Sequence, residues 1–326
     1  MIIMSRIFPM GSLAIDSPEL GNKIKGLANL AGLNICTPRG FGITYAVYEQ
    51  HVEPLLPLLT SILSKGESYR EISLRINEEI IRRGLENEDE IFSALSAHIP
   101  RAKFFAIRSS GAPVIKGTPM VEDSKEASFA GQYESFLMVP RCKVPKAILH
   151  CFASLFSERC LAQFDVKNDH SYLQSRMSVL VQEMCRADLC GVIMTRDPVE
   201  VSSAVLGMEI AYGACEAIVS GQVQGDIHLC DRKSGRILSS ELGSKKWHIS
   251  YESLKDFTRT NKVKIEVKQT ERDRYATSDE LIQKIVRLGM DIENHFGSPQ
   301  DIEFIVSGCD IIITQTRPIT CLTNEQ

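Results

Sequence analysis

The chain has 326 residues, which is long enough for one large domain or for two lobes with substantial hydrophobic cores. Its formal net charge is −4 at pH 7 with no long run of one sign, so nothing indicates a nucleic-acid partner. The sequence shows no signal peptide and no run of about eighteen apolar residues, so nothing indicates a membrane protein. The ten cysteines are scattered singly, with no C-x-x-C pair, which argues against a disulfide framework and a zinc site and favours a cytoplasmic protein.

Helices are predicted for most of the N-terminal third. Residues 21–33 are typical of a loop that enters a short helix, and residues 45–98 are largely helical in pattern. Within them, apolar positions recur between charges over residues 68–83, which predicts an amphipathic helix, and residues 88–98 predict another.

Strands and one long helix follow. Residues 103–110 predict a strand that runs into a loop, and a glycine-bearing loop precedes a second strand at 134–139. Residues 144–164 show a continuous amphipathic stripe and predict one helix. Residues 177–184 and 204–213 then predict two more strands, the first of them buried.

The C-terminal third begins with weakly patterned sequence. Lys245 and Lys246 are interpreted as a solvated pair, with a phosphate contact as the alternative, and the charged residues 251–278 as a surface segment. Apolar residues at helical spacing over 279–296 predict a helix.

Residues 298–320 predict a β-hairpin, because two apolar-alternating runs flank a Ser-Gly-Cys-Asp turn. A three-residue loop over 308–310 places Glu303 opposite Gln315. A two-residue loop instead places Glu303 opposite Thr314 and turns Gln315 away. We expect the first arrangement.

In that register a carboxylate and an amide oxygen share one face of the hairpin, and Arg317 lies just beyond them. Two oxygen ligands beside a guanidinium suit a polyphosphate that carries Mg²⁺. The hairpin therefore predicts Glu303 and Gln315 as metal ligands.

Several stretches together resemble one family of ATP-binding domains. The hairpin carries DIEF followed by QTRPIT, and upstream stand KFFAIRSS, SFAGQ and MSVLVQEM, together with Gly213, Glu216, Ser220, Gly221 and Asp226 in a further matching stretch. These stretches, in this order, are similar to the ATP-binding domain of phosphoenolpyruvate synthase, pyruvate phosphate dikinase and rifampicin phosphotransferase. The resemblance covers residues 12–321.

The resemblance implies roles in phosphate binding. Lys23 and Arg108 correspond to the lysine and arginine that reach the phosphates of the nucleotide, and Arg317 to a third cation of the site. Gly131 and Ser135 lie on the loop that covers the phosphates, where a residue without Cβ lets backbone N–H groups approach an anion. Lys23, Arg108 and Arg317 are therefore the expected catalytic residues.

The resemblance also implies the remaining contacts with Mg²⁺-ATP. Gln182 and Glu183 correspond to a hinge whose backbone groups bind the adenine edge. Glu303 and Gln315 correspond to the residues that contact the metal-bound nucleotide, in agreement with the geometry expected for the hairpin.

The sequence departs from the family pattern in four places, one of which is Gly225 in place of a proline. Asn22 stands where the family has glycine, and residues 111–121 are longer than the usual link. Cys215 also replaces a glycine, and if that position requires a positive φ, the cysteine costs about 1 kcal/mol or more.

The resemblance implies an ATP-grasp α+β fold, with a nucleotide between an N-terminal lobe over residues 1–182 and a C-terminal lobe over residues 183–326. It implies ATP and Mg²⁺ as cofactors. None of the seven histidines lies in the Gly-Gly-x-x-Ser-His setting of the family's phosphohistidine. We therefore expect a phosphotransferase component that phosphorylates a histidine on a separate carrier protein or a small-molecule acceptor. The alternative is a non-catalytic ATP-binding regulatory subunit.

Overall fold

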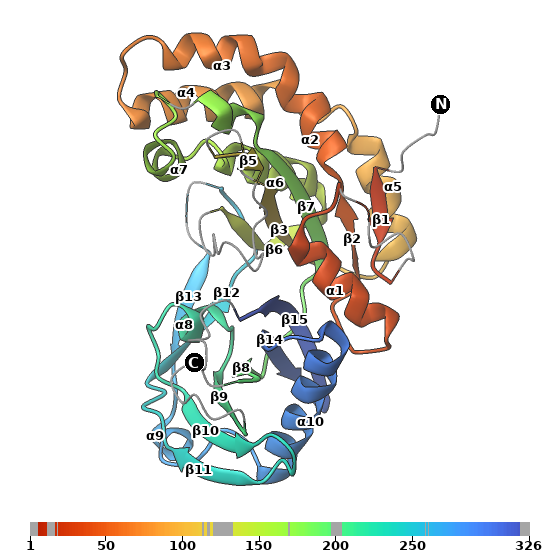
Figure 1. The fold of residues 1–326 in the computed structure, drawn as a ribbon, viewed down its shortest axis with the longest axis vertical. Helices are drawn as coiled ribbons and strands as arrows, with labels where there is room; N and C mark the ends of the chain where they lie inside the picture. The colour runs from red at the N-terminus through yellow and green to blue at the C-terminus, as the bar shows by residue number, and fades with distance from the viewer. Residues whose placement is uncertain are drawn as a thin grey trace. The chain divides into compact units, whose positions relative to one another are not determined.

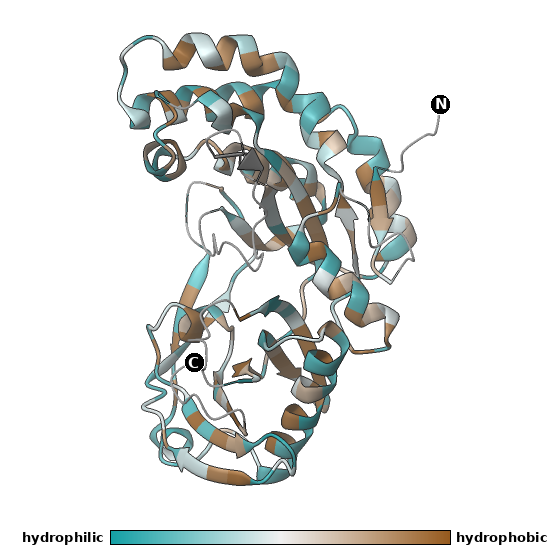
Figure 2. Cartoon of the chain, viewed as in Figure 1, coloured by the Kyte–Doolittle hydropathy of each residue, from teal (hydrophilic) through white to brown (hydrophobic). Residues whose placement is uncertain are grey.

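The fold was analysed in a computed structural model, which describes residues 6–11, 17, 19–112, 114–115, 118–119, 133–168, 170–196, 204–257, 259 and 261–319. These residues form helices and antiparallel sheets (Figure 1), which confirms the predicted α+β class. Hydrophobic residues are frequent on the strands, whereas the helices carry hydrophobic and hydrophilic residues together (Figure 2).

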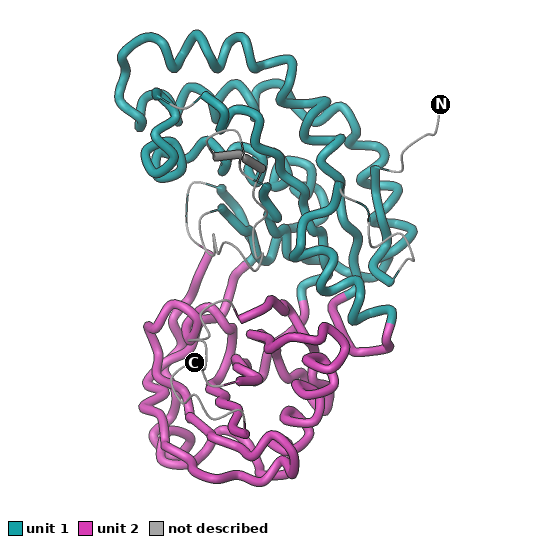
Figure 3. The backbone as a smooth tube through the Cα atoms, viewed as in Figure 1, with its two compact units in different colours: residues 1–32, 39–184, 253–260 teal, residues 33–38, 185–252, 261–326 magenta. Residues whose placement is uncertain are grey.

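The chain forms two compact units (Figure 3). Unit 1 contains residues 1–32, 39–184 and 253–260, and unit 2 contains residues 33–38, 185–252 and 261–326. The main crossing follows Met184, close to the expected boundary after residue 182. A single boundary does not describe the division, however, because two short segments each belong to the unit opposite to that of their flanking chain.

Unit 1 is built on a five-stranded antiparallel sheet in the order β1-β2-β7-β3-β6. Its strands are β1 (Ile7–Pro9), β2 (Gly40–Ile43), β3 (Phe104–Ala112), β6 (Ser135–Pro140) and β7 (Arg176–Glu183), with a separate pair β4 (Val114–Ile115) and β5 (Thr118–Pro119).

In the described part of unit 1, six helices pack against one face of this sheet through one hydrophobic core. They are α2 (Tyr45–Val52), α3 (Leu56–Leu63), α4 (Tyr69–Arg83), α5 (Glu88–His98), α6 (Val144–Ser154) and α7 (Glu158–Gln163), with 3₁₀ turns η1 (Glu53–Leu55), η2 (Arg141–Lys143) and η3 (His170–Gln174). Helix α4 begins at a reciprocal capping box between Ser68 and Glu71, the expected start signal.

Helix α1 (Asn22–Gly32) lies on the opposite face of the sheet, where it contacts β3 and β7. Glycine allows this close approach, because a Cβ on Gly42 would lie 2.7 Å from a side-chain carbon of Ile24. The buried side of α1 is apolar, with Ile24, Leu27 and Leu30 at most 1% exposed.

The single helix predicted over residues 144–164 is wrong, because the chain forms α6 and α7 with a break at Leu155 and Phe156. Both residues are buried, and their N–H groups bond three residues back, which tightens and ends α6. Ser157 then caps α7 by accepting the N–H of Cys160 at 3.3 Å.

Unit 2 is built on a six-stranded antiparallel sheet in the order β11-β10-β9-β8-β14-β15. Its strands are β8 (Leu189–Met194), β9 (Val205–Tyr212), β10 (Asp226–Asp231), β11 (Ile237–Glu241), β14 (Gln300–Ser307) and β15 (Asp310–Pro318), with a separate ribbon of β12 (Trp247–Tyr251) and β13 (Lys262–Glu266) and helices α8 (Glu216–Val219), α9 (Gln269–Arg272) and α10 (Asp279–Phe296).

The two faces of the unit 2 sheet differ. Helix α10 packs on one face beside β14, and its bounds agree with the predicted helix 279–296. On the other face Cys190, Ala211 and Ile305 form a small core with residues of α8 and β12. Polar positions of β14 and β15 continue this second face beyond the small core.

The segment 253–257 joins the core of unit 1. Leu254 is buried there, and its N–H donates to the carbonyl of Met138 at 2.9 Å. Met138 lies at a β-bulge of β6 and has a φ of +55°. Because a bulge turns backbone groups away from the ladder, this strained residue presents its carbonyl to Leu254.

Phe257 stacks on His150, with ring centroids 4.3 Å apart and an interplanar angle of 15°. Burial, together with the nearby ammonium of Lys146, lowers the pKa of His150 to about 4, although Asp256 opposes the shift. The imidazole is therefore neutral in the folded protein at pH values where an unfolded chain already binds a proton.

We expect the free energy of unfolding to fall as the pH is lowered from about 6.5 towards 4. In this range His150 binds a proton in the unfolded state but stays neutral in the folded state. His150→Phe retains the stacked ring and removes the titration, so its unfolding free energy should match that of the wild type at pH 7 and fall less at pH 5. Urea denaturation at both pH values measures this. His51 and His228 also have lowered pKa values, so part of the slope should remain. An unchanged slope in His150→Phe would contradict the assignment.

Candidate functional site

Two predicted cationic residues of unit 1 lie at the same part of the sheet. Lys23 is in the first turn of α1, and its Nζ donates to the carbonyl oxygen of Ser109 at 2.9 Å. Arg108 immediately precedes Ser109 on β3 and is half-buried. The structure therefore brings Lys23 and the backbone beside Arg108 together.

The N-terminus of α1 is fixed against β3 and β7. The N–H of Gly21 donates to Ser178 Oγ at 2.9 Å, and that hydroxyl donates to the carbonyl of Ser110 at 3.0 Å. A Cβ on Gly21 would lie 2.1 Å from Ser110 Oγ, so only glycine fits. Because a helix N-terminus carries a partial positive charge, this arrangement adds to the cationic character near Lys23.

Of the other two predicted phosphate contacts, Ser135 is among the described residues and Gly131 is not. Ser135 lies directly opposite Arg108 in the pairing of β3 with β6 and is exposed. Gly131, together with most of the loop that contains it, lies outside the described residues.

Gln182 and Glu183 end strand β7. Gln182 is 1% exposed, and its Nε2 has no hydrogen-bond acceptor among the described residues. Glu183 accepts two hydrogen bonds from the guanidinium of Arg39, at 2.8 and 2.6 Å, and its own N–H donates to the Arg39 carbonyl at 2.9 Å. Burial opposes the ionised form, but the Arg39 contacts lower the pKa of Glu183 overall. Arg39 is a partner that the sequence pattern did not reveal.

In unit 2 the predicted hairpin is present, but its predicted three-residue loop is wrong. Ser307 pairs with Asp310, which leaves a two-residue loop. A bulge between Glu303 and Phe304 then shifts the register by one residue, so Glu303 pairs with Gln315. The expected carboxylate–amide pair is therefore present, for a reason other than loop length.

Arg317 is held on the same face by Asp301. Its Nε and Nη2 donate to Asp301 Oδ2 at 2.9 and 2.7 Å, and the two residues are directly paired across the strands. Asp301 was not identified from the sequence as the partner of Arg317. The sequence did contain a signal for this pair. Asp301 lies two residues before Glu303 and Arg317 lies two residues after Gln315, so in this register the two side chains face each other across the strands.

A second carboxylate lies along the same row of the sheet. Glu303 pairs with Val192 of β8, and Val192 pairs with Glu209 of β9, so all three share a face. Burial raises the pKa of Glu209, although its Oε1 accepts the N–H of Gly225 at 2.6 Å. Glu209 was not among the predicted residues.

Cys215 causes no backbone strain, because its φ is −56°. The positive φ considered for position 215 is therefore absent. Its Sγ instead contacts the carbonyls of Gly191 and Phe304, at 3.3 and 3.5 Å. Contact with the Cys190 thiol and burial, with a smaller effect of Glu303, raise the pKa of the Cys215 thiol well above its usual value, so this thiol stays protonated.

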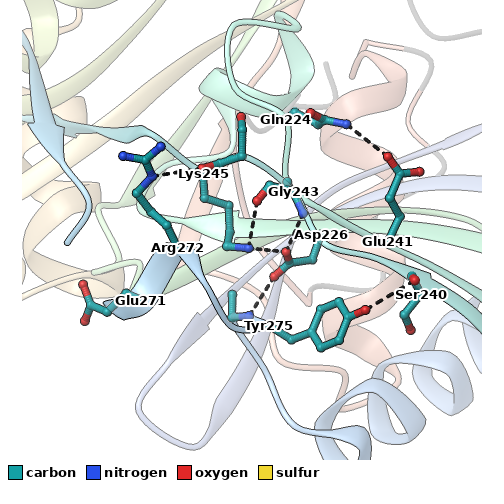
Figure 4. Close-up of polar contacts among 12 residues, drawn as sticks. Gln224, Asp226, Ser240, Glu241, Gly243, Lys245, Glu271, Arg272 and Tyr275 are labelled. Carbon is teal, nitrogen blue, oxygen red and sulfur yellow. Dashed lines mark hydrogen bonds and ion pairs between the residues drawn. The ribbon is translucent and has the colours of Figure 1, made fainter. Parts of the chain in front are cut away.

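Lys245 is buried, so the expectation of a solvated Lys245–Lys246 pair is wrong for its first member. The Lys245 ammonium forms an ion pair with Asp226 and donates to the Gly243 carbonyl at 3.2 Å (Figure 4). The Asp226 carboxylate also accepts the N–H groups of Gly243, at 2.9 Å, and Ala276, at 2.7 Å. A lysine engaged in this way is not a free phosphate contact.

The two units thus supply different chemistry. Unit 1 groups a lysine, an arginine and a helix N-terminus, which attract anions. Unit 2 groups Glu303, Gln315 and the Asp301–Arg317 pair. Within the described ranges no three His, Cys, Asp or Glu residues are placed to hold a metal. Mg²⁺, however, keeps several waters and needs only one or two protein oxygens when phosphates supply the others, so the Glu303–Gln315 pair fits it.

Comparison with known proteins shows what kind of chain carries these groups. Residues 17–326 match the family described as the AMP/ATP-binding domain of pyruvate phosphate dikinase, and the chain belongs to this family. This confirms the resemblance inferred from the motifs.

Three relatives illustrate the range of the family. The chain is 30% identical over 324 residues to a probable phosphoenolpyruvate synthase of Archaeoglobus fulgidus, 30% over 340 residues to the phosphoenolpyruvate synthase of Escherichia coli, and 29% over 307 residues to the rifampicin phosphotransferase of Bacillus subtilis. The similarity includes 95%, 95% and 91% of this chain but only 41%, 41% and 33% of those proteins. The chain therefore spans less than half of their length. None of the helices in the described ranges has the length and apolar character needed to cross a membrane.

Proposed function

We propose that this chain is a Mg²⁺-ATP-dependent phosphotransferase component, which phosphorylates a histidine carrier on a separate protein or a small-molecule acceptor. The observation that carries the proposal is the pairing of Glu303 with Gln315 beside Arg317, in a chain that belongs to an ATP-binding family. Relatives named phosphoenolpyruvate synthase and rifampicin phosphotransferase support phosphotransfer as the reaction class. We place this activity in the cytoplasm.

The proposal includes the ATP-grasp arrangement, in which groups from both units would serve one nucleotide. Lys23, Arg108, Gly131 and Ser135 would bind the phosphates, and Gln182 and Glu183 the base. The buried Nε2 of Gln182, which has no acceptor among the described residues, supports a polar ligand there.

Glu303 and Gln315 would hold Mg²⁺, which supplies positive charge to the phosphate oxygens when bound. The side chains do the remaining work electrostatically. Lys23, Arg108 and Arg317 bring fixed positive charge to oxygens on which negative charge accumulates during phosphoryl transfer. Asp301 orients the guanidinium of Arg317 before any ligand arrives.

The first experiment is a product assay. The protein is incubated with ATP, Mg²⁺ and candidate acceptors, including histidine-carrier proteins, and AMP, ADP and phosphate are measured. Acceptor-dependent release of AMP or ADP supports the proposal. The absence of turnover with every acceptor tested would reject it.

Nucleotide binding should weaken by about 10- to 150-fold in Arg108→Ala, because one charge-assisted contact contributes about 1.5–3 kcal/mol. Isothermal titration with ATP at saturating Mg²⁺ measures the change. Arg82→Ala is the matched control, since the Arg82 side chain is 76% exposed on α4, where it pairs with Glu79. Equal affinities for the wild type and Arg108→Ala would exclude Arg108 from the phosphate site.

The second candidate is a non-catalytic ATP-binding regulatory subunit. The Asp301–Arg317 ion pair favours it, because a guanidinium already neutralised by a carboxylate has less charge to offer a transferring phosphoryl group. This candidate predicts a rise in melting temperature with ATP but no AMP or ADP after long incubation with any acceptor.

A further inference from the structure

A single extra residue, Thr314, determines which side chains of the hairpin share the face of Glu303. Near the turn, Val306 pairs with Ile311 and Phe304 pairs with Ile313. After the bulge, Glu303 pairs with Gln315. Thr314 therefore has no residue of its own opposite it on β14, as expected of a β-bulge.

Without this bulge, the register near the turn would continue along the whole hairpin. Gln315 would then lie opposite Ile302, and Arg317 opposite Gln300. Ile302 and Gln300 are 0% and 1% exposed, on the face that α10 covers. Since a one-residue slip moves side chains to the other face of a sheet, both Gln315 and Arg317 would leave the face of Glu303.

Side chains hold the backbone of β14 at the bulge. Thr314 Oγ1 donates to the carbonyl of Glu303 at 3.2 Å, and Thr314 is 8% exposed. Cys215 Sγ contacts the next carbonyl, that of Phe304, at 3.5 Å. Buried carbonyls at an interrupted ladder need such donors. The Thr314 hydroxyl thus links the extra residue of β15 to the backbone of the metal-ligand candidate.

We propose that Thr314 is a positioning residue of the Mg²⁺ site, whose hydroxyl fixes the bulge and keeps Glu303 opposite Gln315. The inference rests on the proposed function, since it concerns the same two ligands. Thr314 acts through them and touches neither metal nor nucleotide. Its removal should therefore change the requirement for Mg²⁺ more than the affinity for ATP once Mg²⁺ is saturating.

The test is a titration of Mg²⁺ at fixed ATP, with binding measured by calorimetry. Thr314→Val keeps the shape and removes the hydroxyl. It should raise the Mg²⁺ concentration for half-maximal binding by about 2- to 12-fold, the range expected for one lost hydrogen bond. Thr314→Ser restores a hydroxyl and should restore the wild-type midpoint.

Thr316→Val is the matched control, because Thr316 is also a buried threonine of β15 but donates to Gln300 at 2.9 Å on the α10 side. It should lower stability without moving the Mg²⁺ midpoint. If Thr314→Val does not fold, Thr314→Ala removes the same hydroxyl with less volume and is judged by the same midpoint.

The outcomes separate the two proposals. A wild-type protein that binds no ATP at any Mg²⁺ concentration rejects the proposed function and this inference with it. A wild type that binds ATP, together with Thr314 variants whose midpoints equal that of the wild type, rejects the positioning role alone. A shift shared equally by Thr316→Val would also reject it, as a general effect of destabilising β15.

Discussion

Asp226→Ala should destabilise the protein by about 3–5 kcal/mol, because it leaves the buried Lys245 ammonium without its carboxylate. The side chains of the pair are at most 1% exposed, so water cannot replace the lost partner. The N–H group of Gly243, which Figure 4 shows beside the Asp226 carboxylate, loses its acceptor, and so does the N–H group of Ala276. Each buried N–H left unsatisfied adds to the cost.

Urea denaturation at pH 7 measures the change. Lys245→Met should be less damaging than Asp226→Ala, because the Asp226 carboxylate keeps both backbone donors. The double variant should recover only part of the loss, since those donors stay unsatisfied. Lys246→Met, at the exposed neighbouring position, is the control and should change stability by less than about 0.5 kcal/mol. A loss below about 1 kcal/mol in Asp226→Ala would show that this pair is not buried.

Arg317→Met should reduce ATP turnover by about 100- to 1,000-fold if the proposed reaction is correct, the loss typical when one preorganised donor to developing charge is removed. Arg317 is already oriented by two hydrogen bonds to Asp301, so little reorganisation is needed when a phosphate arrives. Methionine keeps the apolar stem and removes the guanidinium. The rate of AMP or ADP formation at saturating ATP and Mg²⁺ is the measurement.

Two variants control this result. Arg317→Lys retains the charge without the planar fork and should give an intermediate rate. Arg186→Met removes a guanidinium of the same unit whose side chain is 85% exposed, and it should leave the rate unchanged. Turnover within about threefold of the wild type in Arg317→Met would remove this residue from the reaction.

Local patterns in the sequence predicted the regular elements well where caps and periodicity agree. Helix α10 begins after Ser278, which accepts the N–H of Leu281, and ends at Gly297 in the left-handed conformation. Both signals are local and can be read from the chain. The break between α6 and α7 was missed because the apolar spacing continues through it, although Ser157 was a possible cap.

Interactions between distant residues were harder to predict. The hairpin was evident, and the Glu303–Gln315 pair was predicted, but from the wrong loop length. A bulge is decided by packing and by contacts such as Thr314 with Glu303, which no local rule specifies. The burial of Lys245 likewise depends on Asp226, nineteen residues earlier, and exposure is the ordinary state of lysine. The position of the bulge and the burial of Lys245 are therefore determined by contacts between distant parts of the chain and not by the neighbouring sequence.

Each unit contains one short segment from the other part of the chain, residues 253–260 in unit 1 and residues 33–38 in unit 2, and these segments determine where the chain can be cut. A fragment ending at Met184 would lack Leu254 and Phe257, so the apolar slot that they fill and the carbonyl of Met138 would face solvent. The complementary fragment would lack residues 33–38, including the Cys36 carbonyl that accepts the N–H of Ile313 on β15. Because each half would expose surface that the other part of the chain covers, recombination or gene splitting at the middle of the chain should produce aggregation-prone pieces, whereas their co-expression should allow them to complement each other.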